Sequence, residues 1–169
     1  MENVVVARAL RTPIGRFMGG LSRLRVAELG AAVVRPLVDG IEDLTVDEVL
    51  FGCGRQAGQR TNPARQIAIA AGLGEGVVAQ TINMACASGL RTISTGVELI
   101  RLGRAKVIVA GGGESMSQVP FMLDRMRDGY RLGNGKLLDG MYHDGFHLSL
   151  IHISEPTRPR LVSRMPSSA

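Results

Sequence analysis

The chain has 169 residues, of which 45% are hydrophobic and 21% charged, a composition typical of a folded domain and not of a disordered segment. Its formal net charge is +5, but the basic residues are spread along the chain without interleaved aromatic side chains, so we expect no nucleic-acid partner. The two cysteines form no disulfide or metal-ligand pattern and no apolar run reaches the roughly 20 residues of a membrane span, so we expect a cytoplasmic protein without metal or membrane contact.

The N-terminal part of the chain predicts one strand and one helix. The apolar, β-branched run 3–7 is typical of a strand that is buried on both faces. From Val26 onward, apolar residues recur at the helical period, which predicts a helix with one apolar face. Because proline removes a helical hydrogen bond and its ring clashes with the preceding turn, Pro36 predicts that this helix kinks or ends near Arg35.

Strands and helices continue to alternate through the middle of the chain. Residues 49–51 and 78–82 predict strands, and between them Asn62-Pro63 predicts a helix start, since asparagine can cap free amides and proline loses no hydrogen bond there. A longer helix over 88–102 is followed by an almost wholly apolar strand over 106–110. The apolar face of that helix is expected to consist of Leu90, Ile93, Val97 and Ile100. This alternation predicts an α/β fold with a mostly parallel sheet.

Cys86 lies at the turn between the strand 78–82 and the helix 88–102. A thiol at a helix start lies near unpaired amides and the positive end of the helix dipole, which favour the thiolate. A thiolate can attack an acyl group, and the same amides could hold the resulting oxyanion. These features predict a nucleophile, and the alternative is a buried structural thiol. Cys53 follows a strand without a helix start, so we assign it to structure.

Four segments resemble segments of thiolases in the same order along the chain. They are V-V-V-A-R-A-L-R-T-P-I-G-R-F-M-G-G-L, Q-A-G-Q-R-T-N-P-A-R-Q, I-N-M-A-C-A-S-G-L around Cys86, and V-A-G-G-G-E-S-M-S-Q-V-P. The resemblance runs from Asn3 to about His147. It implies the N-terminal half of a five-layered α/β fold, with a mostly parallel sheet and helices on both faces. It also implies an acyltransferase that performs reversible Claisen condensation or thiolysis of acyl-CoA, with Cys86 carrying the acyl group as a thioester.

The resemblance further implies acyl-CoA and CoA as substrates, no permanently bound cofactor, and a homodimer or homotetramer. The glycines 111–113 lack the spacing of a dinucleotide loop and are expected to pack beneath the helix that follows Cys86. No cofactor-binding residue can be assigned, and Glu114 is given no chemistry.

Three further catalytic motifs of the family, Gly-His-Pro, Cys-x-Gly and Asn-Glu-Ala, do not occur in this sequence, so we expect the chain alone to be inactive. We interpret His143 and His147 as surface histidines and not as substitute bases. Two alternatives stay open. The first is a ketoacyl-synthase-like or lipid-carrier-type condensing enzyme of the same superfamily, and the second is a non-catalytic interaction module in which Cys86 is structural.

The chain is expected to consist of three regions: a thiolase α/β domain over 1–113, the beginning of a loop domain over 114–147, and a tail over 148–169. The tail begins with L-S-L-I-H-I-S-E-P-T-R, which resembles an in-frame translation of a sequencing-library adapter, and ends with S-R-M-P-S-S-A, which resembles a flow-cell adapter. Such a segment is not selected to pack. Without its three arginines and one glutamate, the net charge falls from +5 to +3.

Overall fold

A computed structural model describes residues 3–147, and its contacts divide the chain into two compact units. The first unit is Met1–Val119 and the second is Pro120–Ala169, of which the described part ends at His147. The expected tail over 148–169 lies outside the described residues.

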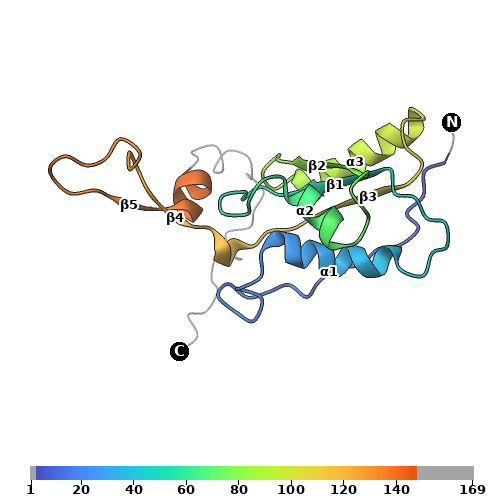
Figure 1. Ribbon diagram of the computed structural model, residues 1–169, viewed down its shortest axis with the longest axis horizontal. Coiled ribbons are helices and arrows are strands. Elements are labelled where there is room, and N and C mark those ends of the chain that lie inside the picture. The colour runs from blue at the N-terminus through green and yellow to red at the C-terminus, as the bar shows by residue number, and fades with distance from the viewer. Residues whose placement is uncertain (1–2, 148–169) are drawn as a thin grey trace, which may run out of the picture. The chain divides into compact units, whose positions relative to one another are not determined.

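The first unit is built on a three-stranded sheet of strands β1 (Glu48–Gly52), β2 (Val78–Ile82) and β3 (Ile108–Gly112). The strand order is β2-β1-β3, and both pairings are parallel (Figure 1). The sequence places β2 correctly, whereas β3 begins later than predicted and continues into the glycines. The parallel sheet is therefore confirmed.

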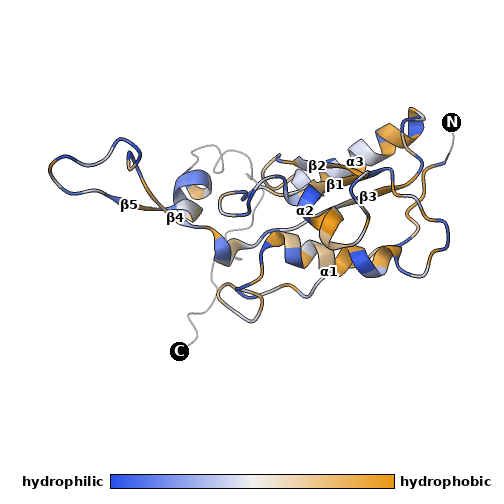
Figure 2. Ribbon diagram, in the orientation of Figure 1, coloured by the Kyte–Doolittle hydropathy of each residue, from blue (hydrophilic) through white to orange (hydrophobic). Residues whose placement is uncertain are grey.

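Helices cover both faces of this sheet, as predicted. They are α1 (Val26–Val38), α2 (Pro63–Ala70) and α3 (Ser88–Arg101). Successive side chains of a strand point to opposite faces. In β1, Val49 and Phe51 belong to the core cluster shared with α1 and α2, while Leu50 lies on the other face, near Gly96 of α3. Hydrophobic and hydrophilic stretches alternate along α1, consistent with one buried and one solvated side (Figure 2).

Helix α1 does not end near Arg35, which corrects one of the two outcomes predicted from Pro36. The helix continues to Val38, and Pro36 is exposed within its last turn. The Arg8 guanidinium donates hydrogen bonds to the carbonyls of Leu37 and Asp39, each at 3.0 Å. The last carbonyls of a helix have no intrahelical partner, so Arg8 satisfies two of the carbonyls at the end of α1.

The strand predicted over 3–7 is not formed. The side chains of Val5 and Val6 are 77% and 79% exposed, and no strand pairs with this segment among the described residues. A strand needs a neighbour to satisfy its backbone N–H and C=O groups. The outer edge of β3 likewise has no pairing strand within residues 3–147.

Helix α3 attaches to the sheet through small and polar residues and not through its apolar stripe. Ser88, Thr92 and Gly96 are buried, whereas Leu90 and Ile93 are 72% and 48% exposed. The expected helix is confirmed, but its apolar stripe is not the face that packs on the sheet. The small residues allow the helix to approach the strands closely, so they decide which side is buried.

Helix α2 begins as the sequence predicts. Asn62 is its N-cap, with a side-chain oxygen that accepts hydrogen bonds from the Arg65 amide at 3.3 Å and from the Thr81 hydroxyl at 2.7 Å. The Asn62 amide group also donates to the Ala79 carbonyl at 3.0 Å. The cap therefore ties α2 to β2, which ends directly before the segment that carries Cys86.

The second unit contains an antiparallel hairpin of β4 (Phe121–Leu123) and β5 (Leu137–Asp139), followed by the π-helical turn η2 (Tyr142–Phe146). Figure 1 shows the long connection between the two strands. Apolar side chains are exposed here, with Leu132 at 98%. Within the described residues of both units, no helix is long and apolar enough to cross a membrane.

Candidate active site

The turn between β2 and α3 presents Cys86 to solvent. The Cys86 side chain is exposed, and Ala87 is the N-cap residue of α3. Ala85, immediately before the cysteine, has φ 49°, a left-handed conformation that costs a residue with a side chain about 1–2 kcal/mol. The tight turn therefore places the thiol just ahead of the first helical turn, where the sequence predicts it.

Neighbouring side chains hold this strained turn in place. The Ser88 hydroxyl donates to the Ala85 carbonyl at 2.7 Å and accepts from the Met84 amide at 2.8 Å. The Asn83 side-chain oxygen accepts from the Ala85 amide at 3.0 Å. Both backbone polar groups of Ala85 are thus satisfied by side chains. Sequence reasoning missed Asn83 and Ser88, and the available signal was two polar residues flanking the cysteine among small apolar ones.

Three backbone amides in the turn before α3 and in its first turn are unpaired within the described residues. The N–H groups of Cys86, Gly89 and Leu90 donate to no partner among residues 3–147. Such amides at a helix start attract negative charge. Such amides can stabilise the oxyanion that forms when a nucleophile adds to a carbonyl.

Glycines bring α3 against the ends of two strands. A Cβ atom on Gly52 would lie 2.6 Å from the backbone carbon of Ser88. A Cβ atom on Gly112 would lie 3.1 Å from both the Gly52 oxygen and the Gly89 Cα. The packing role expected of the glycines 111–113 is confirmed at Gly112. These contacts fix the start of α3 over β1 and β3.

The second cysteine, Cys53, is buried, whereas Cys86 is exposed. Cys53 is fully buried after β1, with its sulfur 3.6 Å from the Arg55 carbonyl oxygen and 3.8 Å from a Glu114 carboxylate oxygen. Burial, and then the Glu114 charge, raise the pKa of Cys53 to about 12. The thiol stays protonated at neutral pH, which makes it a poor nucleophile. The structural assignment made from the sequence is confirmed.

Stability is expected to fall above about pH 9 because of Cys53. The unfolded chain releases this proton near the ordinary pKa of 9.0, while the folded chain keeps it up to about 12. Below pH 9 the contribution of the protonated thiol is fully present, and between the two values it is lost at up to about 1.4 kcal/mol per pH unit. Urea unfolding at several pH values measures this slope. A Cys53→Ala variant should show a shallower slope, and equal slopes would contradict the assignment.

The histidines lie in the second unit. The His143 Nδ1 atom is 2.8 Å from a carboxylate oxygen of Asp144, and both side chains are about half exposed. His147 is exposed as well. Their interpretation as surface residues is confirmed. Within the described part of the chain, no group of three or more His, Cys, Asp or Glu side chains could hold a metal ion.

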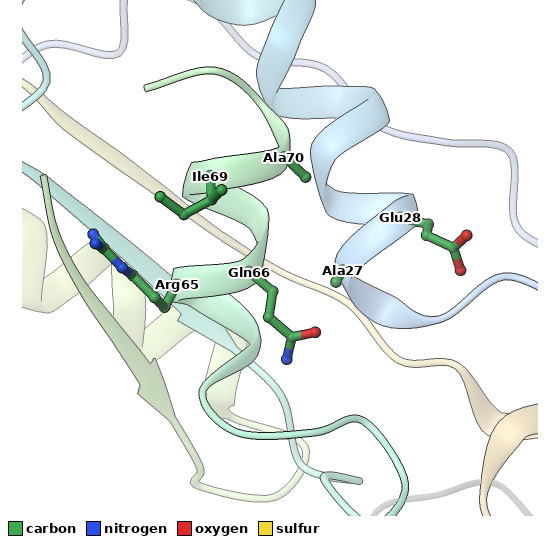
Figure 3. A pocket seen from close by; sticks show the side chains of 6 residues that line it. All are labelled: Ala27, Glu28, Arg65, Gln66, Ile69 and Ala70. Carbon is green, nitrogen blue, oxygen red and sulfur yellow. The ribbon is translucent and has the colours of Figure 1, made fainter. Parts of the chain in front are cut away.

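A surface hollow of about 400 Å³ lies between α1 and α2 (Figure 3). Figure 3 shows Gln66 directed toward α1 and Arg65 directed away from it. The lining residues are Ala27, Glu28, Arg65, Gln66, Ile69 and Ala70. The lining includes neither cysteine and no residue of the turn before α3, so we do not assign acyl chemistry to this hollow.

The family assignment follows from a sequence comparison. The model of the thiolase N-terminal domain matches residues 4–154. The chain belongs to the thiolase family. Similar proteins are an acetyl-CoA acetyltransferase of Pseudomonas aeruginosa, 48% identical, and a probable acetyl-CoA acetyltransferase of Escherichia coli, 45% identical. Each match covers 86% of this thiolase chain and 37% of the relative.

A solved structure supports the same assignment for the fold. The acetyl-CoA acetyltransferase of Bacillus anthracis has a TM-score of 0.80 to this chain and is 39% identical. The similarity covers 85% of this chain and 37% of that one. The predicted fold, the N-terminal half of the thiolase architecture, is therefore confirmed. The chain spans little more than a third of the length of the relatives it matches.

Proposed function

We propose that this chain is the nucleophile-bearing part of a thiolase that transfers acyl groups between CoA thioesters, with Cys86 as the acyl carrier. The observation that carries the proposal is an exposed thiol on a strained turn, next to the unpaired amides of Gly89 and Leu90, in a chain of the thiolase family. The relatives are named acetyl-CoA acetyltransferases, which supports acyl-CoA and CoA as the substrates.

In the proposed half-reaction, the Cys86 thiolate adds to the carbonyl carbon of an acyl-CoA. A carbon–sulfur bond forms, and the carbonyl electron pair moves to the oxygen, which the unpaired amides stabilise. When the carbonyl re-forms, the bond to the CoA sulfur breaks. CoA leaves as a thiolate and takes a proton from solvent, and the acyl group stays on Cys86 as a thioester.

The proposal includes the expected organisation: a thiolase domain over 1–113, the beginning of a loop domain over 114–147, and an adapter-derived tail over 148–169. The family match extends to residue 154 and so overlaps the start of that tail. Codons unrelated to the adapter would refute the assignment of the tail to adapter sequence.

We also propose a cytoplasmic homodimer or homotetramer without a permanently bound cofactor for the whole protein.

Two other functions are weighed against this one. A ketoacyl-synthase-like or lipid-carrier-type condensing enzyme would keep the same nucleophile, but the names of the relatives favour a thiolase. A non-catalytic interaction module would leave Cys86 without chemistry, and its exposure beside free amides counts against that function.

The test is a single-turnover experiment on the purified chain. After mixing with acetyl-CoA, we expect release of up to one CoA per chain and no continued turnover, because the family's downstream catalytic motifs do not occur in this sequence. Absence of any CoA release would count against Cys86 as acyl carrier. Sustained thiolysis of acetoacetyl-CoA would show that the chain needs no further catalytic residues.

A further inference from the structure

Glu114 follows β3, and its carboxylate accepts hydrogen bonds from the loop that follows β1. One carboxylate oxygen accepts a hydrogen bond from the Gly54 amide at 2.5 Å, and the other accepts from the Arg55 amide at 2.9 Å. Both oxygens therefore act as acceptors for successive backbone N–H groups. A carboxylate can do this, whereas a side-chain amide has a single acceptor oxygen.

The loop that contains Gly54 also contacts the turn that carries Cys86. The Asn83 side-chain amide donates to the Gly54 carbonyl at 3.1 Å, while its oxygen accepts from the Ala85 amide at 3.0 Å. A Cβ atom added to Gly54 would lie 3.3 Å from the Glu114 carboxylate and 3.4 Å from the Ala85 oxygen. The Glu114 carboxylate and Ala85 of the strained turn therefore both lie close to Gly54.

We infer that Glu114 is a positioning residue for Cys86 and acts through Gly54 and Asn83. The carboxylate fixes the loop, the loop fixes Asn83, and Asn83 holds Ala85 in its left-handed conformation. Ala85 directly precedes Cys86, so its conformation sets where the thiol lies relative to the free amides of α3. This inference rests on the proposed function of Cys86, because it explains how that thiol is presented.

The test compares iodoacetamide alkylation of Cys86 in the intact chain and its variants, read by peptide mapping. A positioning role predicts that loss of the carboxylate loosens the turn that presents the thiol, so Glu114→Gln should slow alkylation about three- to tenfold. Glu98→Gln is the matched control: it removes one carboxylate from the surface pair with Arg91 on α3, and should leave the rate unchanged.

A second variant keeps the inference falsifiable if the first one unfolds. Asn83 is exposed, so Asn83→Ala should fold and show a similar slowing. Because Glu114 acts through Asn83, the double variant should be no slower than Asn83→Ala alone. The buried Cys53 reports global unfolding in Asn83→Ala and Glu98→Gln. Urea unfolding reports it in Glu114→Gln, because the Glu114 carboxylate lies 3.8 Å from the Cys53 sulfur. Multiplied effects in the double variant, or faster alkylation in Glu114→Gln, would overturn the inference.

Amide hydrogen exchange at Ala85 separates this inference from the proposed function. Glu114→Gln should speed that exchange about tenfold, and Glu98→Gln should not, whatever the chemistry of Cys86. Unchanged exchange at Ala85 overturns the positioning role even if Cys86 is acylated. Accelerated exchange in a chain that takes up no acyl group supports the positioning role while refuting the proposed function.

Discussion

A Cys86→Ser variant is expected to lose acyl transfer from acetyl-CoA by about a thousandfold or more. Cys86 is exposed and directly precedes the N-cap of α3, and its own amide and those of Gly89 and Leu90 donate to no partner within residues 3–147. A serine hydroxyl at the same place ionises far less readily and needs a general base to become a nucleophile. The substitution leaves the strained turn intact, because the hydrogen bonds that hold the turn come from Asn83 and Ser88.

Retention of radiolabelled acetyl groups on the denatured chain measures this loss. Cys53→Ala is the matched control, since it removes the buried thiol and should leave acyl uptake within about twofold of the original chain. Label retained by Cys86→Ser but lost in Cys53→Ala would place the acyl group on the wrong cysteine. Label retained by both variants would show that the acyl acceptor is another residue.

Gly52→Ala is expected to destabilise the chain by about 3 kcal/mol or more, or to prevent folding. The new Cβ atom would meet three backbone atoms of α3, at 2.6 Å, 2.7 Å and 2.8 Å. These atoms belong to Ser88 and Gly89 and cannot rotate away as a side chain could. The start of α3 would have to lift from β1, which would displace the turn before it.

Urea unfolding measures the cost of this substitution. Gly20→Ala is the matched control, because a Cβ atom at Gly20 would meet no atom within 4 Å. The control should change the free energy of unfolding by less than about 0.5 kcal/mol. If the two variants have equal stability, the close approach of α3 to β1 is not present in solution.

The parts of the fold that follow from local chemistry could be predicted. Asn62 and Pro63 start α2 because capping and a fixed φ act within a few residues. The strand β2 and the helix α3 were recognised from their apolar patterns and lie where expected. Cys86 falls at their junction for the same reason.

The parts of the fold that depend on residues distant in sequence could not be predicted. The run 3–7 has the composition of a strand, but a strand forms only where another pairs with it. At the end of α1, the carbonyls of Leu37 and Asp39 accept hydrogen bonds from Arg8, which lies far from them in sequence. The buried face of α3 follows from close backbone approach at Gly52 and Gly112, which periodicity does not reveal.

The site shows the same limit. The position of Cys86 just before a helix start follows from the sequence, whereas the residues that hold its turn do not. Asn83 contacts Gly54 across 29 residues, and Glu114 reaches Gly54 across 60. Side chains that act over such separations carry no local pattern, so their roles became visible only in the folded chain.

The most direct test compares iodoacetamide alkylation of the two cysteines in the folded chain and in the urea-unfolded chain at neutral pH. Cys86 lies beside free amides at a helix start, so folding should accelerate its alkylation. Cys53 is buried with its pKa raised to about 12, so folding should suppress its alkylation almost completely. If folding slows both cysteines, or leaves Cys86 no faster than in the unfolded chain, Cys86 is not the activated nucleophile.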